Sequence, residues 1–161
     1  MPVRGLFGLG INARCQGNRG NQGTRRYPEF IPGVAQELRQ ACLYHLLAGD
    51  YDESVRQAYL TVEEALRKKL WRSGVRNPAP GLGKMWIQAF GHPDPKKDKG
   101  GALALDLSED EKQGIKNLGL GAANFFRNPI AHSRPGRTGE EAIVGIYLAD
   151  LLLRIIERTE G

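Results

Sequence analysis

The sequence has no uninterrupted apolar run long enough to span a membrane. The longest candidate, Ala142–Ile156, is interrupted by Asp150 and Arg154. The N-terminus also lacks the continuous apolar segment that a secretory signal requires. We therefore expect a cytoplasmic protein without a membrane partner.

The sequence is also poor in residues that bind metals or nucleotides. Its cysteines, Cys15 and Cys42, form no metal-like spacing and are expected to stay reduced. The three histidines, His45, His92 and His132, are scattered without the spacing of metal ligands. No glycine-rich phosphate-binding loop of the P-loop type is present. We therefore expect no metal and no cofactor.

Outside the N-terminus the chain has almost no net charge, although its total is +5. Residues 1–30 contain five arginines against one glutamate, together with six glycines and no periodic apolar pattern. Such a composition cannot bury enough apolar surface to fold. We expect residues 1–30 to be a disordered Gly/Arg-rich arm and residues 31–161 to be the folded domain. An inert extension is favoured over a loose RNA-binding arm.

The domain has no useful strand alternation, and its apolar residues recur at spacings of three and four. This pattern predicts an all-α, up-and-down bundle of four to five helices. The predicted helices are Val34–Ala48, Asp50 to Gly74, Gly83–Phe90, Ser108–Arg127 and Thr138–Arg158.

Three helix starts carry the signature of a capping box, in which a side chain at the N-cap and a glutamate three residues later bond reciprocally. The pairs are Asp50 with Glu53, Ser108 with Glu111, and Thr138 with Glu141.

The last two predicted helices each have an unusual feature. Gly114, Gly119 and Gly121 weaken the first of them, so we expect another backbone to approach closely there. The last helix is apolar on most faces and must be covered nearly all round. This predicts a homodimer formed through the C-terminal helices.

The segment that is most informative about function joins these two helices. It runs from Arg127 and Asn128 to His132. Pro129 disfavours the α conformation at Asn128, so the preceding helix should end near Arg127. A guanidinium binds phosphate rigidly, and an imidazole titrates near neutral pH. These groups are the minimum needed to cleave a phosphodiester without a metal. Taken alone, the pair is also compatible with a helix-terminal cation and a solvated histidine.

This Arg-polar-x-x-x-His segment, between the last two helices of an all-α domain, resembles the signature of the HEPN superfamily. The chain is more narrowly similar to the Ymh-type family of uncharacterised bacterial and phage-associated proteins, over about Phe30 to Glu157. The supporting segments are residues 47–58, 83–90 and 119–132. Ser133 and Arg134 depart from the family pattern, in which an acidic residue often follows the histidine.

The resemblance implies a metal-independent endoribonuclease that acts through 2′-hydroxyl attack at a dimer interface, in a toxin–antitoxin or phage-defence setting. It implies that Arg127 binds the phosphate, His132 moves protons, and Asn128 holds the phosphate or the imidazole. Arg134 and Arg137 are predicted to bind flanking phosphates, and an antitoxin or defence protein is an expected partner. Two alternatives remain open, namely a non-catalytic nucleotide- or RNA-binding protein and a helical assembly module.

Overall fold

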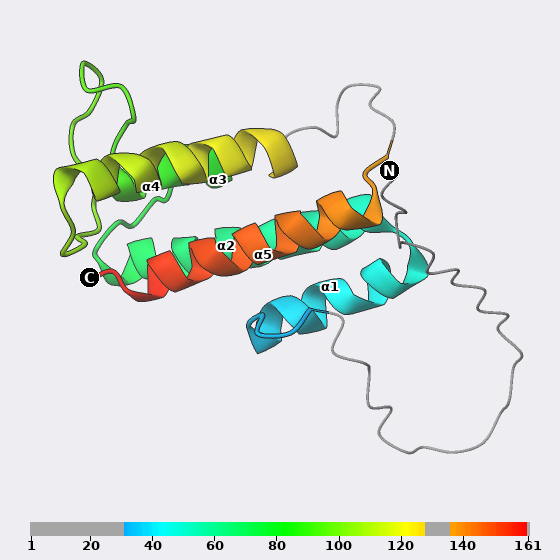
Figure 1. Cartoon of the computed structure of the whole chain (residues 1–161). Coiled ribbons are helices and arrows are strands. Elements are labelled where there is room, and N and C mark those ends of the chain that lie inside the picture. The colour runs from blue at the N-terminus through cyan, green and yellow to red at the C-terminus, as the bar shows by residue number, and fades with distance from the viewer. Residues whose placement is uncertain (1–30, 128–135, 161) are drawn as a thin grey trace, which may run out of the picture. The chain divides into compact units, whose positions relative to one another are not determined.

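The computed structural model describes residues 31–127 and 136–160, all within a unit formed by residues 31–161. The predicted disordered arm lies outside the described residues. Five α-helices and one π-helical turn follow one another along the chain (Figure 1). They are α1 (Gln36–Ala48), α2 (Tyr51–Arg72), α3 (Leu82–Phe90), α4 (Glu109–Ala122), η1 (Ala123–Arg127) and α5 (Gly139–Glu157).

The predicted all-α bundle is confirmed. Within the part of the chain that the structure describes, the β structure is an isolated bridge between Ala104 and Glu160. No helix of this part is long and apolar enough to cross a membrane.

Helix α2 lies at the centre of the domain. Helices α1, α3 and α5 and the turn η1 all pack against it, and in Figure 1 α5 runs alongside α2 while α3 and α4 form a pair. The apolar residues that α2 contributes to the core are fully buried, and they are Val55, Ala58, Tyr59, Val62, Leu66 and Leu70. Because a buried side chain of this size contributes about 1.5–3 kcal/mol, α2 provides much of the stability that holds the other helices.

Two of the three predicted capping boxes are complete, those at Ser108 and Thr138. At the third, Asp50 accepts a hydrogen bond from the backbone N–H of Glu53, but the return bond is not made. The Glu53 carboxylate instead accepts two bonds of 2.6 Å from Arg56 and one of 2.7 Å from Gln57. These bonds lower the pKa of Glu53 to about 2, Arg56 contributing most. A bidentate, charge-assisted pair is stronger than a bond to a backbone amide, so the Glu53 carboxylate binds Arg56 instead of the backbone N–H of Asp50.

The two charged residues that interrupt the apolar run of α5 have a structural role. Asp150 is buried and accepts hydrogen bonds from Ala35 N (2.8 Å) and from Arg154 Nε (2.7 Å). Arg154 in turn donates to the carbonyl of Gly33 at 2.8 Å. This pair therefore fastens the start of α1 to α5.

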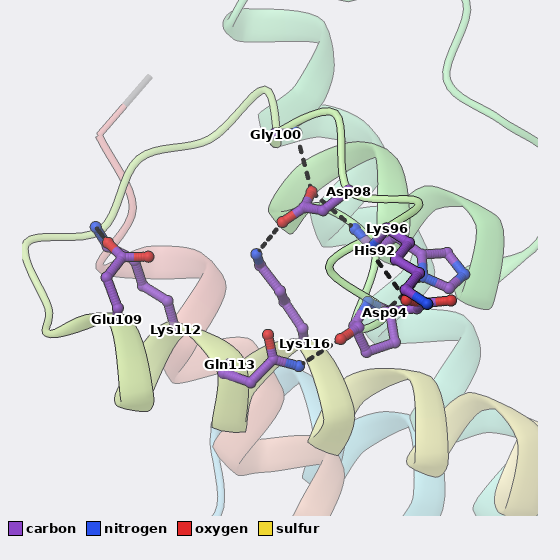
Figure 2. Close-up of polar contacts among 10 residues, drawn as sticks. His92, Asp94, Lys96, Asp98, Gly100, Glu109, Lys112, Gln113 and Lys116 are labelled. Carbon is purple, nitrogen blue, oxygen red and sulfur yellow. Dashed lines mark hydrogen bonds and ion pairs between the residues drawn. The ribbon is translucent and has the colours of Figure 1, made fainter.

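The long connection between α3 and α4 is held against α4 by a polar network (Figure 2). The Asp98 carboxylate accepts a hydrogen bond from the backbone N–H of His92 (3.2 Å) and pairs with Lys116 of α4. The hydrogen bond from Lys116 is the main cause that lowers the pKa of Asp98. Gln113 of α4 donates to the carbonyl of Pro93 at 2.7 Å. These contacts fix the loop without a hydrophobic core of its own.

The glycines of α4 have different surroundings from those expected. A Cβ atom at Gly119 would lie 1.9 Å from Cε2 of Trp86, so the close neighbour is an indole ring and not a backbone. Trp86 is fully buried and donates to the carbonyl of Ile115 at 3.1 Å. Gly114 and Gly121 have no neighbour within 4 Å of such a Cβ among the described residues, so the predicted close approach is wrong within the chain there.

These surroundings predict opposite effects of alanine at two glycines of the same helix. Gly119→Ala should lower the free energy of unfolding by about 1–3 kcal/mol, because the buried indole must move. At a protein concentration at which the chain is monomeric, Gly114→Ala should raise it by up to about 1 kcal/mol through helix propensity, since no described residue lies within 4 Å of a Cβ there. Urea unfolding followed by circular dichroism measures both, and equal effects of the two substitutions would contradict the packing described.

Candidate functional site

The predicted helix over Ser108–Arg127 changes its hydrogen-bonding pattern before it ends. Residues Ala123–Arg127 form the π-helical turn η1, where an α-helix was expected to continue. Phe126 in this turn stacks on Tyr59 of α2, with ring centroids 5.5 Å apart and an angle of 12° between the planes. Gly145 of α5 makes room for the ring, since a Cβ there would lie 2.9 Å from Cε1 of Phe126. Short π-helical turns occur often at functional sites, and here the turn presses Phe126 onto α2.

Packing of Phe126 brings the next residue, Arg127, against a carboxylate in the middle of α2. Nε of Arg127 lies 3.5 Å from Oε2 of Glu63. The other oxygen of Glu63 accepts a hydrogen bond from Arg67 at 3.0 Å. Glu63 is only 12% exposed, whereas the Arg127 side chain is 27% exposed. Glu63 is largely buried because η1 packs against this part of α2.

Three buried polar atoms of α2 and η1 form no hydrogen bond with any described residue, although two of them face each other in the ion pair of Glu63 and Arg127. They are the hydroxyl of Tyr59, Oε2 of Glu63 and Nε of Arg127. Burial also raises the pKa of the Tyr59 phenol, which therefore stays neutral near pH 7. Folded proteins leave few buried polar groups unpaired, so these three atoms need an explanation. A binding or catalytic site that keeps polar groups ready for a ligand is one such explanation.

Arg137 fastens the start of α5 to the same corner. Its guanidinium pairs with Asp52 of α2 and donates to the carbonyls of Phe125 (3.2 Å) and Phe126 (3.3 Å). The guanidinium also lies 5.7 Å from the centre of the Phe126 ring. These bonds satisfy carbonyls at the end of η1 that have no helical partner. The side chain is only 14% exposed, and its predicted role in binding a flanking phosphate stays a prediction.

The remaining predicted site residues, Asn128, His132 and Arg134, lie outside the described residues. The structure gives the anchoring of the chain on either side of them. Arg127 lies against Glu63, and Arg137 reaches back to the carbonyls at the end of η1. Arg127 and Arg137 thus both lie at one corner of the domain, while the meeting of Arg127 and His132 stays a prediction.

An open apolar groove of about 520 Å³ runs along α4 and ends at this corner. Its lining residues are Gly114, Asn117, Leu118, Gly121, Ala122, Phe125, Phe126 and Leu148. Helix α5, which contributes Leu148 to this groove, also exposes large apolar side chains at Val144 (61%), Tyr147 (39%) and Leu151 (45%). The described residues thus leave part of the apolar surface of the last helix uncovered.

Other candidate chemistry finds little support in the described residues. Burial raises the pKa of the Cys42 thiol to about 12, so the thiol is not a nucleophile near neutral pH. Among residues 31–127 and 136–160, no group of three or more His, Cys, Asp or Glu side chains could hold a metal ion.

The sequence analysis missed Tyr59 and Glu63. They are four residues apart on α2 and therefore share one side of that helix. A glutamate at the edge of the buried stripe was the available signal. Its partner could not be identified, because the contact depends on the π-helical turn.

The chain was compared with known proteins in three ways. The family model Hypoth_Ymh, described as a protein of unknown function, matches residues 33–156. No curated protein and no solved structure gives a match. The match covers nearly the same residues as the predicted resemblance and confirms its narrower part.

The contact of Glu63 with Arg127 predicts different effects at two adjacent glutamates of α2. Glu63→Ala should lower the free energy of unfolding by about 1–3 kcal/mol, because a buried guanidinium nitrogen loses the carboxylate that faces it. Glu64→Ala should change it by about 0.5 kcal/mol or less, since Glu64 is 72% exposed and pairs with Lys68 at 4.0 Å. Chemical denaturation of both variants measures the difference, and matching values would mean that Glu63 does not hold η1.

Proposed function

We propose that this chain, which belongs to the Hypoth_Ymh family of proteins of unknown function, is a metal-independent endoribonuclease of the HEPN type. The observation that supports it most is the fixed position of Arg127. The largely buried carboxylate of Glu63 lies beside Nε of this cation, and the Tyr59 hydroxyl on the same helix forms no hydrogen bond with any described residue. The resemblance of residues 127–132 to the HEPN signature supplies the reaction, and a toxin–antitoxin or phage-defence setting with an antitoxin or defence partner belongs to the same proposal.

Arg127 is the proposed phosphate-binding residue. Glu63 lies beside Nε, so the two terminal nitrogens of the guanidinium are the ones that can meet a phosphate. The carboxylate would weaken an isolated cation, but Arg67 pairs with its other oxygen and restores a net positive charge of the cluster. A cation held in this way needs little reorganisation when charge develops on the phosphorane.

His132 and Asn128 complete the proposed chemistry. One His132 takes the proton of the 2′-hydroxyl, whose oxygen attacks phosphorus, while the bond to the 5′-oxygen breaks. The departing oxygen takes a proton from an acid, which leaves a 2′,3′-cyclic phosphate and a 5′-hydroxyl. One imidazole cannot be base and acid at the same instant, so the second role falls to His132 of another copy. Asn128 orients the phosphate or the imidazole, and Arg134, with Arg137 beside it, serves the flanking phosphates.

A homodimer through the C-terminal helices is part of this proposal. The apolar groove along α4, to which α5 contributes Leu148, and the exposed apolar side chains of α5 are the surfaces proposed to meet a second copy, and the groove ends at Phe126, next to Arg127 in the chain. The open space over Gly114 and Gly121 lets a helix of a second copy approach α4 closely. A two-fold axis at this surface brings two copies of the catalytic segment together.

The same groove favours a second candidate function, that of a helical assembly module without catalysis. An apolar surface alone serves assembly, whereas the buried polar cluster at Tyr59, Glu63 and Arg127 is unnecessary for it. A non-catalytic RNA-binding protein would keep Arg127 but would not need His132. A measurement of RNA cleavage distinguishes the enzyme from the assembly module and from the non-catalytic RNA-binding protein.

The ribonuclease proposal predicts cleavage of single-stranded RNA by the purified full chain in EDTA. Arg127→Ala should reduce the rate by about 10²–10³ and His132→Ala by about 10²–10⁴. Lys97→Ala changes an exposed loop lysine and serves as the control, with an unchanged rate. Absence of cleavage by the parent, or full activity of His132→Ala in a folded sample, would refute the proposal.

The dimer proposal predicts unequal effects at two leucines with the same exposure. Leu151 on α5 is 45% exposed and Leu47 on α1 is 44% exposed. Leu151→Glu should weaken dimerisation at least about ten-fold, since it buries an unpaired charge in the interface. Leu47→Glu should leave the dimer intact. Light scattering after size-exclusion chromatography gives the masses, and a monomeric parent protein would contradict the proposal.

A further inference from the structure

The C-terminal half of α2 and the chain after it carry a concentrated positive charge. Residues 65–93 contain six Lys and Arg and no Asp or Glu. The near-neutral sum over residues 31–161 conceals this concentration. The exposed members of this stretch that lie around Trp71 are Lys68, Arg72 and Arg76, and these four residues are called the Trp71 surface below.

Trp71 itself is unusually exposed for a tryptophan. It is 53% accessible, and the guanidinium of Arg76 lies over its ring, 4.9 Å from the ring centre. The cation covers one face of the indole and leaves a large part of the ring in contact with solvent. An exposed aromatic ring backed by arginine is a surface on which a nucleobase can stack.

The cations beside Trp71 are available for phosphates. Arg67 and Lys68 pair with Glu63 and Glu64 on their own helix, and Lys69 donates to the carbonyl of Thr159. In contrast, Arg72 and Arg76 form no ion pair with any residue of the described ranges. The guanidinium of Arg76 lies over the indole, and Arg72 follows Trp71 directly in the chain.

The Trp71 surface lies along the same side of α2 as the candidate site. Glu63, Arg67 and Trp71 follow one another at spacings of four, and the eight residues from Glu63 to Trp71 correspond to about 12 Å of helix. A single-stranded RNA bound at Arg127 can thus continue along α2 to Trp71.

We infer that the Trp71 surface is a binding subsite for single-stranded RNA, in which Trp71 stacks on a base and Arg72 and Arg76 contact the neighbouring phosphates. The inference rests on the proposed function in so far as it makes this strand the ribonuclease substrate. An acidic peptide would use the cations but has no reason to need the exposed indole. An anionic membrane would use both, but the large exposed apolar side chains of α4 and α5 are not part of this surface.

Binding is measured in a full-length His132→Ala background, so that cleavage does not interfere. The probe is a fluorescein-labelled single-stranded RNA of mixed sequence, followed by anisotropy. Trp71→Ala should weaken binding about ten-fold or more, and Trp71→Phe should keep most of the affinity. Tyr44→Ala removes another exposed ring, 76% accessible on α1, and should have no effect.

Two further measurements test the assignment of each contact. Arg76→Ala should reduce the slope of log affinity against log salt by about one phosphate contact. RNA should quench the fluorescence of Trp71, whereas the buried Trp86 should keep its emission in Trp71→Phe. A duplex of the same sequence should bind more weakly, because its bases are not free to stack.

The outcomes separate this inference from the ribonuclease proposal. Binding that depends on Trp71 supports the subsite even if the parent protein never cleaves RNA. Equal affinity of Trp71→Ala and Tyr44→Ala would overturn the subsite even if the parent cleaves. Tighter binding of an acidic peptide or of anionic vesicles than of RNA, lost in Trp71→Ala, would also overturn it.

Discussion

The site depends on the packing of η1 against α2. Phe126 stacks on Tyr59 in a space that Gly145 leaves open, and this contact sets Arg127 against Glu63. Arg137 then bonds the carbonyls at the end of the turn and pairs with Asp52. Arg127 and Arg137 both contact carboxylates of α2, at Glu63 and Asp52. A change that destabilises α2 should therefore also displace these two arginines.

The charges on the surface of the domain are distributed unevenly. Glu63 is surrounded by Arg67 and Arg127, and from there toward the end of α2 the surface becomes cationic and ends at Trp71 and Arg76. Large apolar side chains are instead exposed along the groove of α4 and on α5. A polyanion and a second copy of the chain are partners that fit these two surfaces, and both would meet near Arg127.

Local signals in the sequence predicted the helices well. Ser108 and Thr138 begin their helices because each cap needs only residues three positions apart, and Gly49 ends α1 in the left-handed conformation that glycine allows. Contacts between distant residues were not predictable in the same way. The contact of Glu63 with Arg127 depends on a π-helical turn, and the glycine at position 119 is explained by a tryptophan of α3. The charge summed over the domain also hid the cationic end of α2.

A crystal structure of the full chain with a bound single-stranded DNA, which lacks the reactive 2′-hydroxyl, tests the central claim most directly. The account predicts a dimer in which the terminal nitrogens of Arg127 contact a phosphate while Nε stays beside Glu63, with His132 of both copies near that phosphate. Arg127 and His132 pointing into separate environments, with no second copy nearby, would contradict it.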